Sequence, residues 1–347
     1  MIPIAGSFGA ATAPRNGPTG SSFAARVLDS VSMGFAAVLA SIALVLGAPA
    51  PPGGAVAAPG RDDTAALQAQ LDAGGTVFLP RLPDGQCYAT HGLWVSLDGT
   101  SIVSDGACIV ALGPGPVRLH SPDGDPIAAD AIFFVNRSSD ANAAPNGVTI
   151  SGLRLVVPRS ASMFGVEIYA SDVTVEGVRV EGNPIDSLLV GGRANGEGYS
   201  SNASIRGSSL TGGTRNVVSV TAVRGLTIEG CLLTGADDTN YLPETGHAYG
   251  NPAAGIDVEP NSPGDPIVGV RITGNQIVGN AGPGILLALP PTPTEPPSVD
   301  ISGNRIEGNG LKTTPPVLGG IVAPAGQPGV TIGSNVIGQN NGPDLAH

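Results

Sequence analysis

Residues 270–280 read VRITGNQIVGN, and close variants of this stretch recur along the chain. Seven variants begin at Val148, Val173, Ala203, Leu226, Val270, Val299 and Val330, at intervals of 25, 30, 23, 44, 29 and 31 residues. Val270 and Ile272 alternate with polar residues, which is the periodicity of a strand, and the pattern resumes at Ile277 after a glycine. A repeat this short buries its apolar face by stacking on its neighbours. The repeats therefore predict an all-β solenoid, a single-stranded parallel β-helix whose turns contain the glycines.

Particular positions of the repeat keep their chemical character from one variant to the next. The third position carries Ile150, Val175, Ile205, Ile228, Ile272, Ile301 and Ile332, and the eighth carries Leu155, Val180, Leu210, Leu233, Ile277, Ile306 and Ile337. Asparagines occupy the sixth and eleventh positions of the last repeats, at Asn275, Asn304 and Asn335 and at Asn280, Asn309 and Asn340. Branched apolar residues suit the inward sites of strands, and stacked asparagines hydrogen-bond along a ladder. We expect two apolar columns inside the coil and two asparagine ladders at its bends.

The composition fits a solenoid and narrows the class of partner. The 52 glycines and 32 prolines are explained as turn residues of the repeats, and charged residues make up 13% of the chain. The net charge is -12. The 16 basic residues are 15 arginines and one lysine, Lys312. A nucleic-acid partner needs a basic surface, and the negative net charge argues against such a partner. A polysaccharide remains compatible, including an acidic one held by local arginines or a metal.

The N-terminal region has the pattern of an export signal. Residues 34–47 are apolar and uncharged, Arg15 and Arg26 precede them, and residues 55–57 read AVA, a small-residue cleavage site. We therefore expect residues 1–57 to be a signal peptide with a long N-terminal extension, and residues 58–347 to form the β-helix domain of a secreted protein, extracellular or periplasmic. The alternative is a retained anchor, since residues 31–50 approach the length that spans a bilayer. Cleavage would leave no stable membrane insertion.

The cysteines agree with export. Cys87 and Cys108 are 21 residues apart, about one turn of the coil, so we expect them on neighbouring strands within reach of a disulfide. Cys231 occupies the same repeat position as Val178 and Asn275. That position predicts a small buried side chain and not a nucleophile.

The start of the domain predicts a cap. Residues 61–80 read RDDTAALQAQLDAGGTVFLP, which predicts a short helix over about residues 62–73, ended by Gly74, and a first strand from Thr76. A helix there would cover the open end of the coil. This segment and the later repeats resemble the pectate-lyase-like superfamily of right-handed parallel β-helix proteins, from Arg61 to the end. The resemblance implies a right-handed coil but selects no reaction, because the superfamily contains lyases, hydrolases, epimerases, tailspikes and adhesins.

The longest interval between repeats contains an insertion that interrupts the pattern. Residues 235–264 read GADDTNYLPETGHAYGNPAAGIDVEPNSPG, and loops on rigid scaffolds often carry function. From this segment and the neighbouring strands we expect a polysaccharide-binding groove that includes Asp237, Asp238, Tyr241, Tyr249, Glu167 and Arg215. Asp237 and Asp238 could hold Ca²⁺ with Asn240, but such a run is more often a turn, and we predict no metal site and no cofactor.

The insertion ends in a strand that carries two acids. Alternation places Ile256 and Val258 in the core and directs Asp257 and Glu259 outward, roughly 6.5–7 Å apart along the strand. This is the low end of the separation between the acid and the base of an inverting glycosidase. We therefore predict Asp257 and Glu259 as a catalytic pair, with His247 as an assisting acid or base. The alternative is a solvent-exposed outer face whose charged residues have no catalytic role.

The motifs of particular enzymes are incomplete. Polygalacturonase-like hydrolases carry Asn-Thr-Asp, Asp-Asp, Gly-His-Gly and Arg-Ile-Lys, of which the chain offers Asp237-Asp238 and Gly246-His247-Ala248 at too short a spacing. The Asp-Pro-His-Asp motif of mannuronan epimerases is absent, and Arg215 and Arg224 lie in no lyase motif. The sequence thus favours a secreted protein that cleaves glycosidic bonds of a polysaccharide. The alternatives are a non-catalytic adhesion or binding solenoid and a polysaccharide lyase or epimerase, with substrate, linkage and oligomeric state left open.

Overall fold

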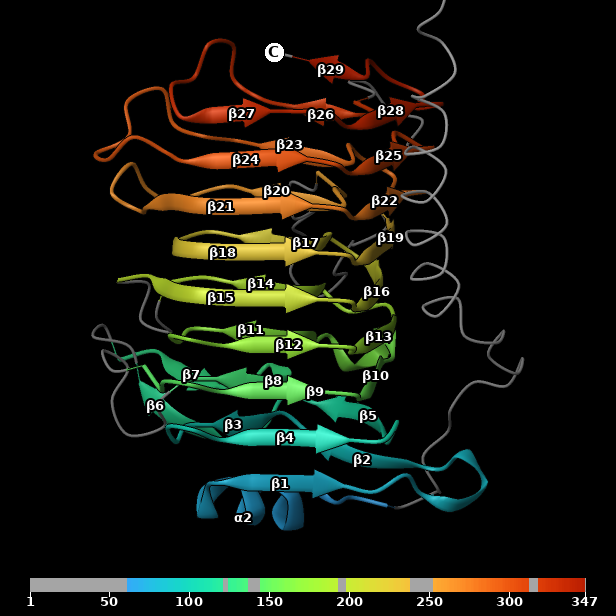
Figure 1. Cartoon of the computed structure of the whole chain (residues 1–347). Helices are drawn as coiled ribbons and strands as arrows, with labels where there is room; N and C mark the ends of the chain where they lie inside the picture. Colours follow the sequence, from blue (N-terminus) through green and yellow to red (C-terminus); the bar gives the residue numbers. More distant parts are fainter. Residues whose placement is uncertain are drawn as a thin grey trace, which may run out of the picture. The chain divides into compact units, whose positions relative to one another are not determined.

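The computed structural model describes residues 61–120, 124–136, 144–192, 198–237, 252–311 and 318–346. In this part of the chain the strands form three parallel sheets, and each sheet takes one strand from each turn of the coil, as Figure 1 shows. The predicted signal peptide, residues 1–57, lies outside the described residues. Among the described residues, no helix has the length and apolar character needed to cross a membrane.

Within each of the three sheets the strands follow one another in chain order. A short hairpin and two single-turn helices lie outside these sheets. Sheet A contains β1 (Thr76–Leu79), β4 (Ser101–Ser104), β9 (Thr149–Ser151), β12 (Thr174–Glu176), β15 (Ser200–Arg206), β18 (Val223–Glu229), β21 (Ile267–Thr273), β24 (Val299–Ser302) and β27 (Val330–Ile332). Sheet B contains β2 (Cys87–His91), β5 (Cys108–Gly113), β10 (Arg154–Val157), β13 (Arg179–Gly182), β16 (Ser209–Gly213), β19 (Leu232–Ala236), β22 (Gln276–Val278), β25 (Arg305–Glu307) and β28 (Val336–Gly338). Sheet C contains β3 (Leu93–Val95), β8 (Ala131–Val135), β11 (Phe164–Ile168), β14 (Asp186–Val190), β17 (Asn216–Val220), β20 (Ile256–Val258), β23 (Ile285–Leu287), β26 (Ile321–Val322) and β29 (Leu345–Ala346). The antiparallel hairpin is β6 (Val117–His120) and β7 (Pro126–Ala128), and the single-turn helices are η1 (Pro83–Gly85) and η2 (Arg159–Ala161).

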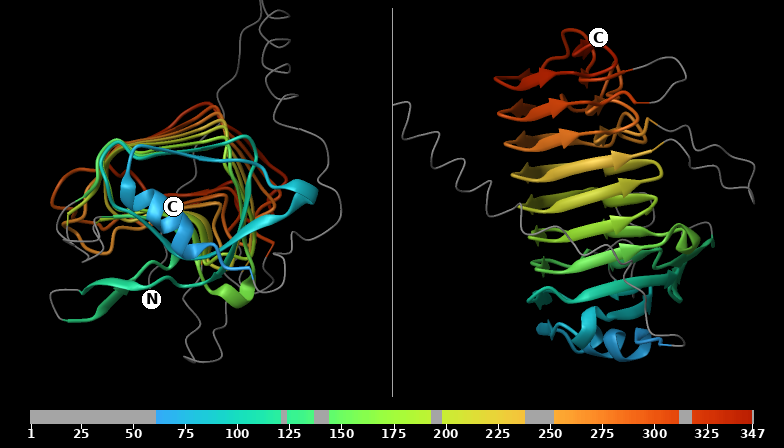
Figure 2. Two further views of the ribbon diagram at one scale, coloured as in Figure 1. Left: turned by 90° about the horizontal axis from the view of Figure 1, so that it is seen from below. Right: turned by 90° about the vertical axis from the view of Figure 1, so that its right-hand side faces the viewer.

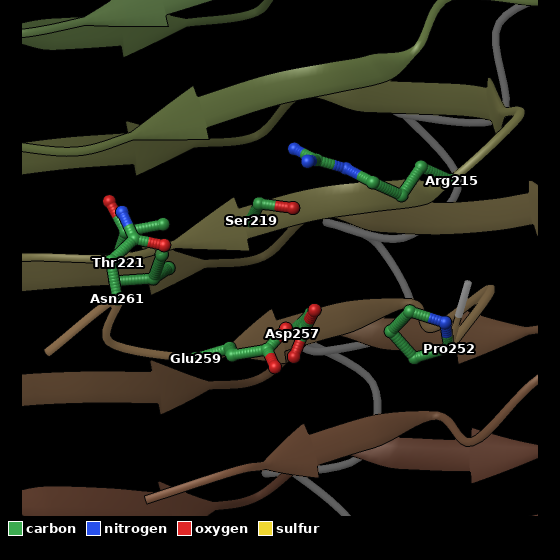
Figure 3. A pocket seen from close by; sticks show the side chains of 8 residues that line it. Arg215, Ser219, Thr221, Pro252, Asp257, Glu259 and Asn261 are labelled. Atoms are coloured by element: carbon green, nitrogen blue, oxygen red, sulfur yellow. The ribbon is translucent and has the colours of Figure 1, made fainter. Parts of the chain in front are cut away.

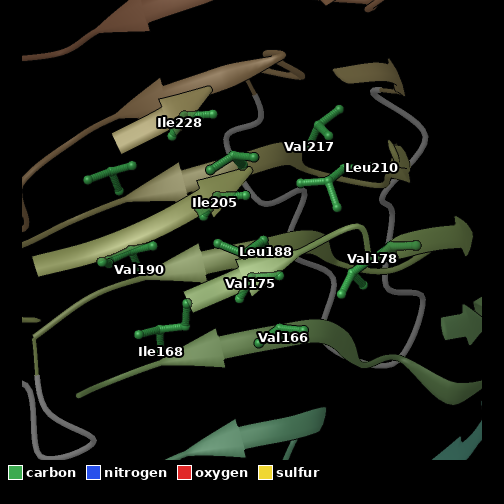
Figure 4. Close-up of a cluster of buried hydrophobic side chains, with 14 of the residues drawn as sticks. Val166, Ile168, Val175, Val178, Leu188, Val190, Ile205, Leu210, Val217 and Ile228 are labelled. Carbon is green, nitrogen blue, oxygen red and sulfur yellow. The ribbon is translucent and has the colours of Figure 1, made fainter. Parts of the chain in front are cut away.

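The two apolar columns lie inside the coil, as predicted. Val175, Ile205 and Ile228 are opposite one another in register, fully buried, and stacked in Figure 4. The last members of the two columns, Ile332 and Ile337, are only half-buried. Within the described residues, the turn that carries them has a neighbouring turn on one side only. Stacking parallel strands buries apolar side chains from consecutive turns against each other, which stabilises the coil.

Both asparagine ladders are confirmed at the bends. The side-chain amide of Asn275 donates to Asn304 Oδ1 at 2.9 Å, and that of Asn304 donates to Asn335 Oδ1 at 2.9 Å. Asn280, Asn309 and Asn340 form the second ladder in the same way, with distances of 2.9 and 3.1 Å. Each ladder also accepts backbone N–H groups of the preceding turn, so these asparagines satisfy buried backbone and are scaffold.

The cysteines are placed as the sequence predicts. Cys87 and Cys108 are opposite one another in β2 and β5 and form a disulfide, with a Cα–Cα distance of 4.5 Å. Cys231 is free and buried, and burial raises the pKa of its thiol to about 11.

The capping helix α2 (Thr64–Ala73) buries Leu67 and Leu71 against the end of the coil, where Figure 2 shows it lying across the opening. It begins at Thr64 and not at residue 62. Asp63 instead pairs with Ala89 through a backbone bond and a side-chain bond.

Candidate functional site

The outward row of sheet C contains the candidate catalytic acid. In the register of the parallel strands, Glu167 is opposite Leu189, Leu189 is opposite Ser219, and Ser219 is opposite Asp257. Ile256 and Val258 on either side of Asp257 are fully buried in the core, so alternation directs the carboxyl group of Asp257 away from it. Glu259 follows on the same face as Asp257.

Asp257 faces outward but is almost completely covered, with 4% of its surface exposed. Its Oδ2 accepts a hydrogen bond from Asn216 Nδ2 at 3.0 Å. Its Oδ1 is buried and has no hydrogen-bond partner within the described structure. A buried carboxyl oxygen without a partner is costly when the group is charged, so this environment favours the protonated acid.

The protonation of Asp257 follows from these surroundings. Burial, together with the negative charges of Glu259 and Asp186, raises the pKa of Asp257 to about 7. Arg215 and the hydrogen bond from Asn216 act in the opposite direction. A group with this pKa holds a proton at neutral pH and can also release it, which is the requirement for a general acid.

Asp257 and Glu259 line one cavity of about 120 Å³ on the outer face of sheet C, shown in Figure 3. Its polar lining comes from Arg215, Ser219, Thr221, Asp257, Glu259 and Asn261. Glu259 is exposed, and its backbone N–H donates to Val220 O at 3.0 Å, which fixes the end of the strand beside β17. The structure therefore brings together a covered carboxyl group and an exposed carboxylate at the same cavity.

Arg215 lies at this cavity as one half of an ion pair. Its Nε donates to Asp186 Oδ1 at 3.0 Å, and a second bond joins Nη2 to Asp186 Oδ2. Burial alone would lower the pKa of Arg215, but the charge of Asp186 and its hydrogen bond to the guanidinium outweigh burial and raise it. The guanidinium thus stays charged and cannot accept a proton.

Asn216 links this ion pair to Asp257. Its backbone N–H donates to Asp186 Oδ1 at 3.0 Å, and its side-chain Oδ1 accepts the backbone N–H of Ala254 at 2.9 Å. Because a backbone N–H can only donate, the amide oxygen of Asn216 must face Ala254 and the amide nitrogen must face Asp257 and Ser219. The donor that reaches Asp257 is therefore fixed in orientation by the backbone.

Glu167 lies three turns away along the same row and does not line the cavity. It is 2% exposed, and Tyr169 donates its hydroxyl to Glu167 Oε1 at 3.0 Å. Burial, followed by the charge of Asp130 and a hydrogen bond with it, raises the pKa of Glu167 well above its ordinary value. The neighbouring outer apolar cluster consists of Trp94, Leu119, Ala129, Ala131, Phe134, Phe164 and Leu189. Sequence reasoning expected Glu167 on an open groove, and the structure places it in a sealed position.

Several predicted residues fall outside the described part of the chain, namely His247, Asp238, Tyr241 and Tyr249. Asp237 is described at the end of β19, where its N–H donates to Gly213 O at 2.8 Å. Among the described residues, no group of three or more His, Cys, Asp or Glu side chains could hold a metal ion.

Sequence reasoning missed Asp186 and Asn216. Both lie at the start of strands in sheet C, opposite one another in register. A signal existed for Asn216, because it directly precedes residues 217–220, which read VVSV and are typical of a strand. The alignment of residues 186–190 with residues 216–220 was not predictable, since the intervals between the repeats differ.

The chain matches no family sequence model and no curated protein. Its structure is similar to the tailspike protein of Escherichia coli bacteriophage HK620, crystallised with a hexasaccharide, with a TM-score of 0.51 and 14% identity over 84% of this chain and 50% of the tailspike. Weaker similarities link it to tailspike gp49 of Acinetobacter baumannii bacteriophage Fri1 (TM-score 0.44, 16% identity, 79% of this chain and 46% of gp49) and to PfbA, a surface adhesin of Streptococcus pneumoniae (0.46, 13%, 84% and 81%). The chain spans about half the length of these tailspikes. The fold is that of the right-handed parallel β-helix proteins.

Proposed function

We propose that this chain is a secreted glycoside hydrolase that cleaves a polysaccharide at the cavity of sheet C, with Asp257 as general acid and Glu259 as general base. The observation that carries the proposal is the environment of Asp257. It is covered, it has one unpartnered oxygen, its pKa is raised to about 7 by burial, and it lines a cavity with a second carboxylate. Most glycoside hydrolases cleave the glycosidic bond with two carboxyl groups that lie in different environments.

Asn216 determines which oxygen of Asp257 holds the proton. Its amide nitrogen donates to Oδ2, and an oxygen that accepts such a bond is the carbonyl oxygen of a protonated carboxyl group. The proton of the acid therefore belongs on Oδ1, the oxygen without a partner. Oδ1 is buried, so in the proposed step the carboxyl group turns toward the cavity when the polysaccharide binds, and its proton passes to the oxygen of the scissile glycosidic bond as the leaving group departs.

Glu259 would supply the second half of the reaction. A carboxylate exposed to solvent binds water readily, and the cavity of about 120 Å³ has room for a few water molecules, each of which occupies about 30 Å³ in the liquid. In the proposed step Glu259 accepts a proton from water while the water oxygen bonds to the anomeric carbon. Asp257 gives its proton to the departing sugar, so charge and protons balance.

Polysaccharide as the ligand is supported by the comparisons as well as by the acids. The tailspike of bacteriophage HK620 shares the fold, and its structure is a complex with a hexasaccharide. We extend the ligand class, polysaccharide, to this chain as part of the proposal. Export through residues 1–57 would place it where polysaccharides occur, and N-terminal sequencing of exported protein should begin after residue 57.

The second candidate is a non-catalytic polysaccharide-binding or adhesion solenoid. The observation that favours it is the lining of the cavity, where no aromatic ring occurs among the described residues to stack on a sugar. A lyase or epimerase is less well supported. Arg215 is the basic group at the cavity within the described residues, and the raised pKa that its pairing with Asp186 causes prevents it from acting as a base.

An assay on a panel of polysaccharides, read for both new reducing ends and unsaturated products, separates these candidates. The proposal predicts reducing ends without unsaturated products, and their loss in Asp257→Asn. Glu167→Gln is the matched control, since it removes a buried carboxyl group of the same row without touching the cavity. Unsaturated products would indicate a lyase, and binding without products would indicate the adhesion solenoid.

A further inference from the structure

The charges around the cavity constrain the chemistry of the sugar that it accepts. Among the described residues that line the cavity, Arg215 is the one basic side chain. Arg215 donates two hydrogen bonds to Asp186, which is fully buried. The positive charge of Arg215 is therefore already matched by the carboxylate to which it is bound.

The remaining charge at the cavity is negative. Glu259 is exposed at the cavity, and Asp257 is either neutral or negative according to pH. The other polar lining residues, Ser219, Thr221 and Asn261, are uncharged. The net charge at the cavity is therefore negative in both protonation states of Asp257.

The sequence on either side adds no compensating cation. Residues 235–264 contain the acids Asp237, Asp238, Glu244, Asp257 and Glu259 and no lysine or arginine. The single lysine of the chain is Lys312, and the net charge of the whole chain is -12. An anionic sugar would approach a negative cavity on a negative protein, and juxtaposed like charges reduce affinity.

We propose that the glycan bound at this cavity carries no anionic group, so that the substrate is a neutral polysaccharide and not a polyuronate or a sulfated or sialylated glycan. This inference rests on the proposed function and specifies its substrate class. Neutral sugars present hydroxyl groups that both donate and accept hydrogen bonds, which suits the hydroxyls of Ser219 and Thr221 and the amide of Asn261.

The test compares matched polysaccharides with and without their carboxylates. Binding and cleavage are measured for uronate-containing polysaccharides and for the same polymers after chemical reduction of the carboxyl groups, with EDTA and with added Ca²⁺. We expect the reduced member of a pair to bind at least about tenfold more tightly at low salt. For any uronate polymer that does bind, added NaCl should strengthen binding, because salt screens repulsion.

A variant with an added positive charge sharpens the test. Thr221→Lys adds a cation to the cavity lining and should raise affinity for the uronate polymers, whereas Thr227→Lys adds the same charge on the outer face of sheet A and should not. Thermal unfolding of both variants verifies that they fold.

Preference of the wild type for the anionic member, uronate binding that weakens with salt, or uronate cleavage that requires Ca²⁺ overturns the inference. Failure to bind any member of any pair is a different result. It removes the proposed function itself, and the inference with it.

Discussion

Glu167 and Asp257 occupy the same outward row of sheet C, and both are almost completely buried. Burial raises the pKa of both carboxyl groups. Glu167 lies among Tyr169, Asp130 and the outer apolar cluster, away from the cavity. Asp257 lies at the cavity, beside an exposed carboxylate.

The difference between the two groups separates protonation from access. Burial raises the pKa of a carboxyl group that has no cationic partner, and Glu167 shows that such a raised pKa can be a structural feature. Catalysis requires in addition that the proton faces a space in which a substrate can bind, and that a second group completes the reaction. In the described structure Asp257 lines a cavity together with a second carboxylate, and Glu167 does not.

The largest expected effect is the loss of activity when the acid at the cavity is removed. Asp257→Asn should lower turnover by about 10²- to 10⁴-fold, the range of general acid–base contributions, and Glu259→Gln by a similar factor. Glu167→Gln should leave turnover close to that of the wild type. The measurement is release of reducing ends on the best polysaccharide of the panel. Equal losses in all three variants would erase the distinction between the two positions.

A second effect is a pH-dependent gain of stability in Asp257→Asn. The pKa of Asp257 rises from 3.8 to about 7 on folding, so the folded state holds the proton more tightly and wild-type stability falls as pH rises from about 4 to 7. The variant escapes this loss, and above pH 7 its free energy of unfolding should exceed that of the wild type by up to roughly 4 kcal/mol. Denaturant unfolding at several pH values measures it. A constant difference between the two proteins across this pH range would contradict a raised pKa.

The third effect concerns the donor that holds Asp257. Asn216→Ala removes the bond from Nδ2, which stabilises the carboxylate, so the pKa of Asp257 should rise further, by about one pH unit. Because the acid works in its protonated form, the alkaline limb of the pH–activity profile should move to higher pH.

Asn304→Ala is the matched control for this variant. It removes a buried asparagine of a ladder and should lower stability without moving the limb of the profile. An unchanged limb in Asn216→Ala would reduce Asn216 to a scaffold residue.

The smallest effect is expected at the buried position of Glu167. Tyr169→Phe removes one hydrogen bond to Glu167 and should cost about 1 kcal/mol of stability, with no change in turnover. Thermal unfolding and the reducing-end assay together measure it. A large loss of turnover would show that the row between the two acids acts as one unit.

The fold was predictable because each element depends on local, repeated chemistry. Alternation defined the inward columns, and the repeated Asn275 and Asn304 defined a ladder, since a regular coil brings equal positions of consecutive repeats together. The spacing of Cys87 and Cys108 predicted their pairing for the same reason.

The site was less accessible to sequence reasoning. Alternation predicted that Asp257 faces outward, but it did not predict its burial or its hydrogen bond from Asn216, which lies on the neighbouring turn. The ion pair between Asp186 and Arg215 joins residues 29 positions apart in the chain. Repeat intervals between 23 and 44 residues leave the register of sheet C undefined by sequence, so that contact could not be read from it.

The role of Asp257 as the acid is tested most directly by a pH titration of its carboxyl carbon by ¹³C NMR, assigned by comparison with Asp257→Asn. We predict a midpoint near pH 7, because burial and the charges of Glu259 and Asp186 disfavour the carboxylate. A midpoint near the ordinary aspartate value of about 4 would mean that Asp257 is ionised at neutral pH, and would contradict its role as the acid.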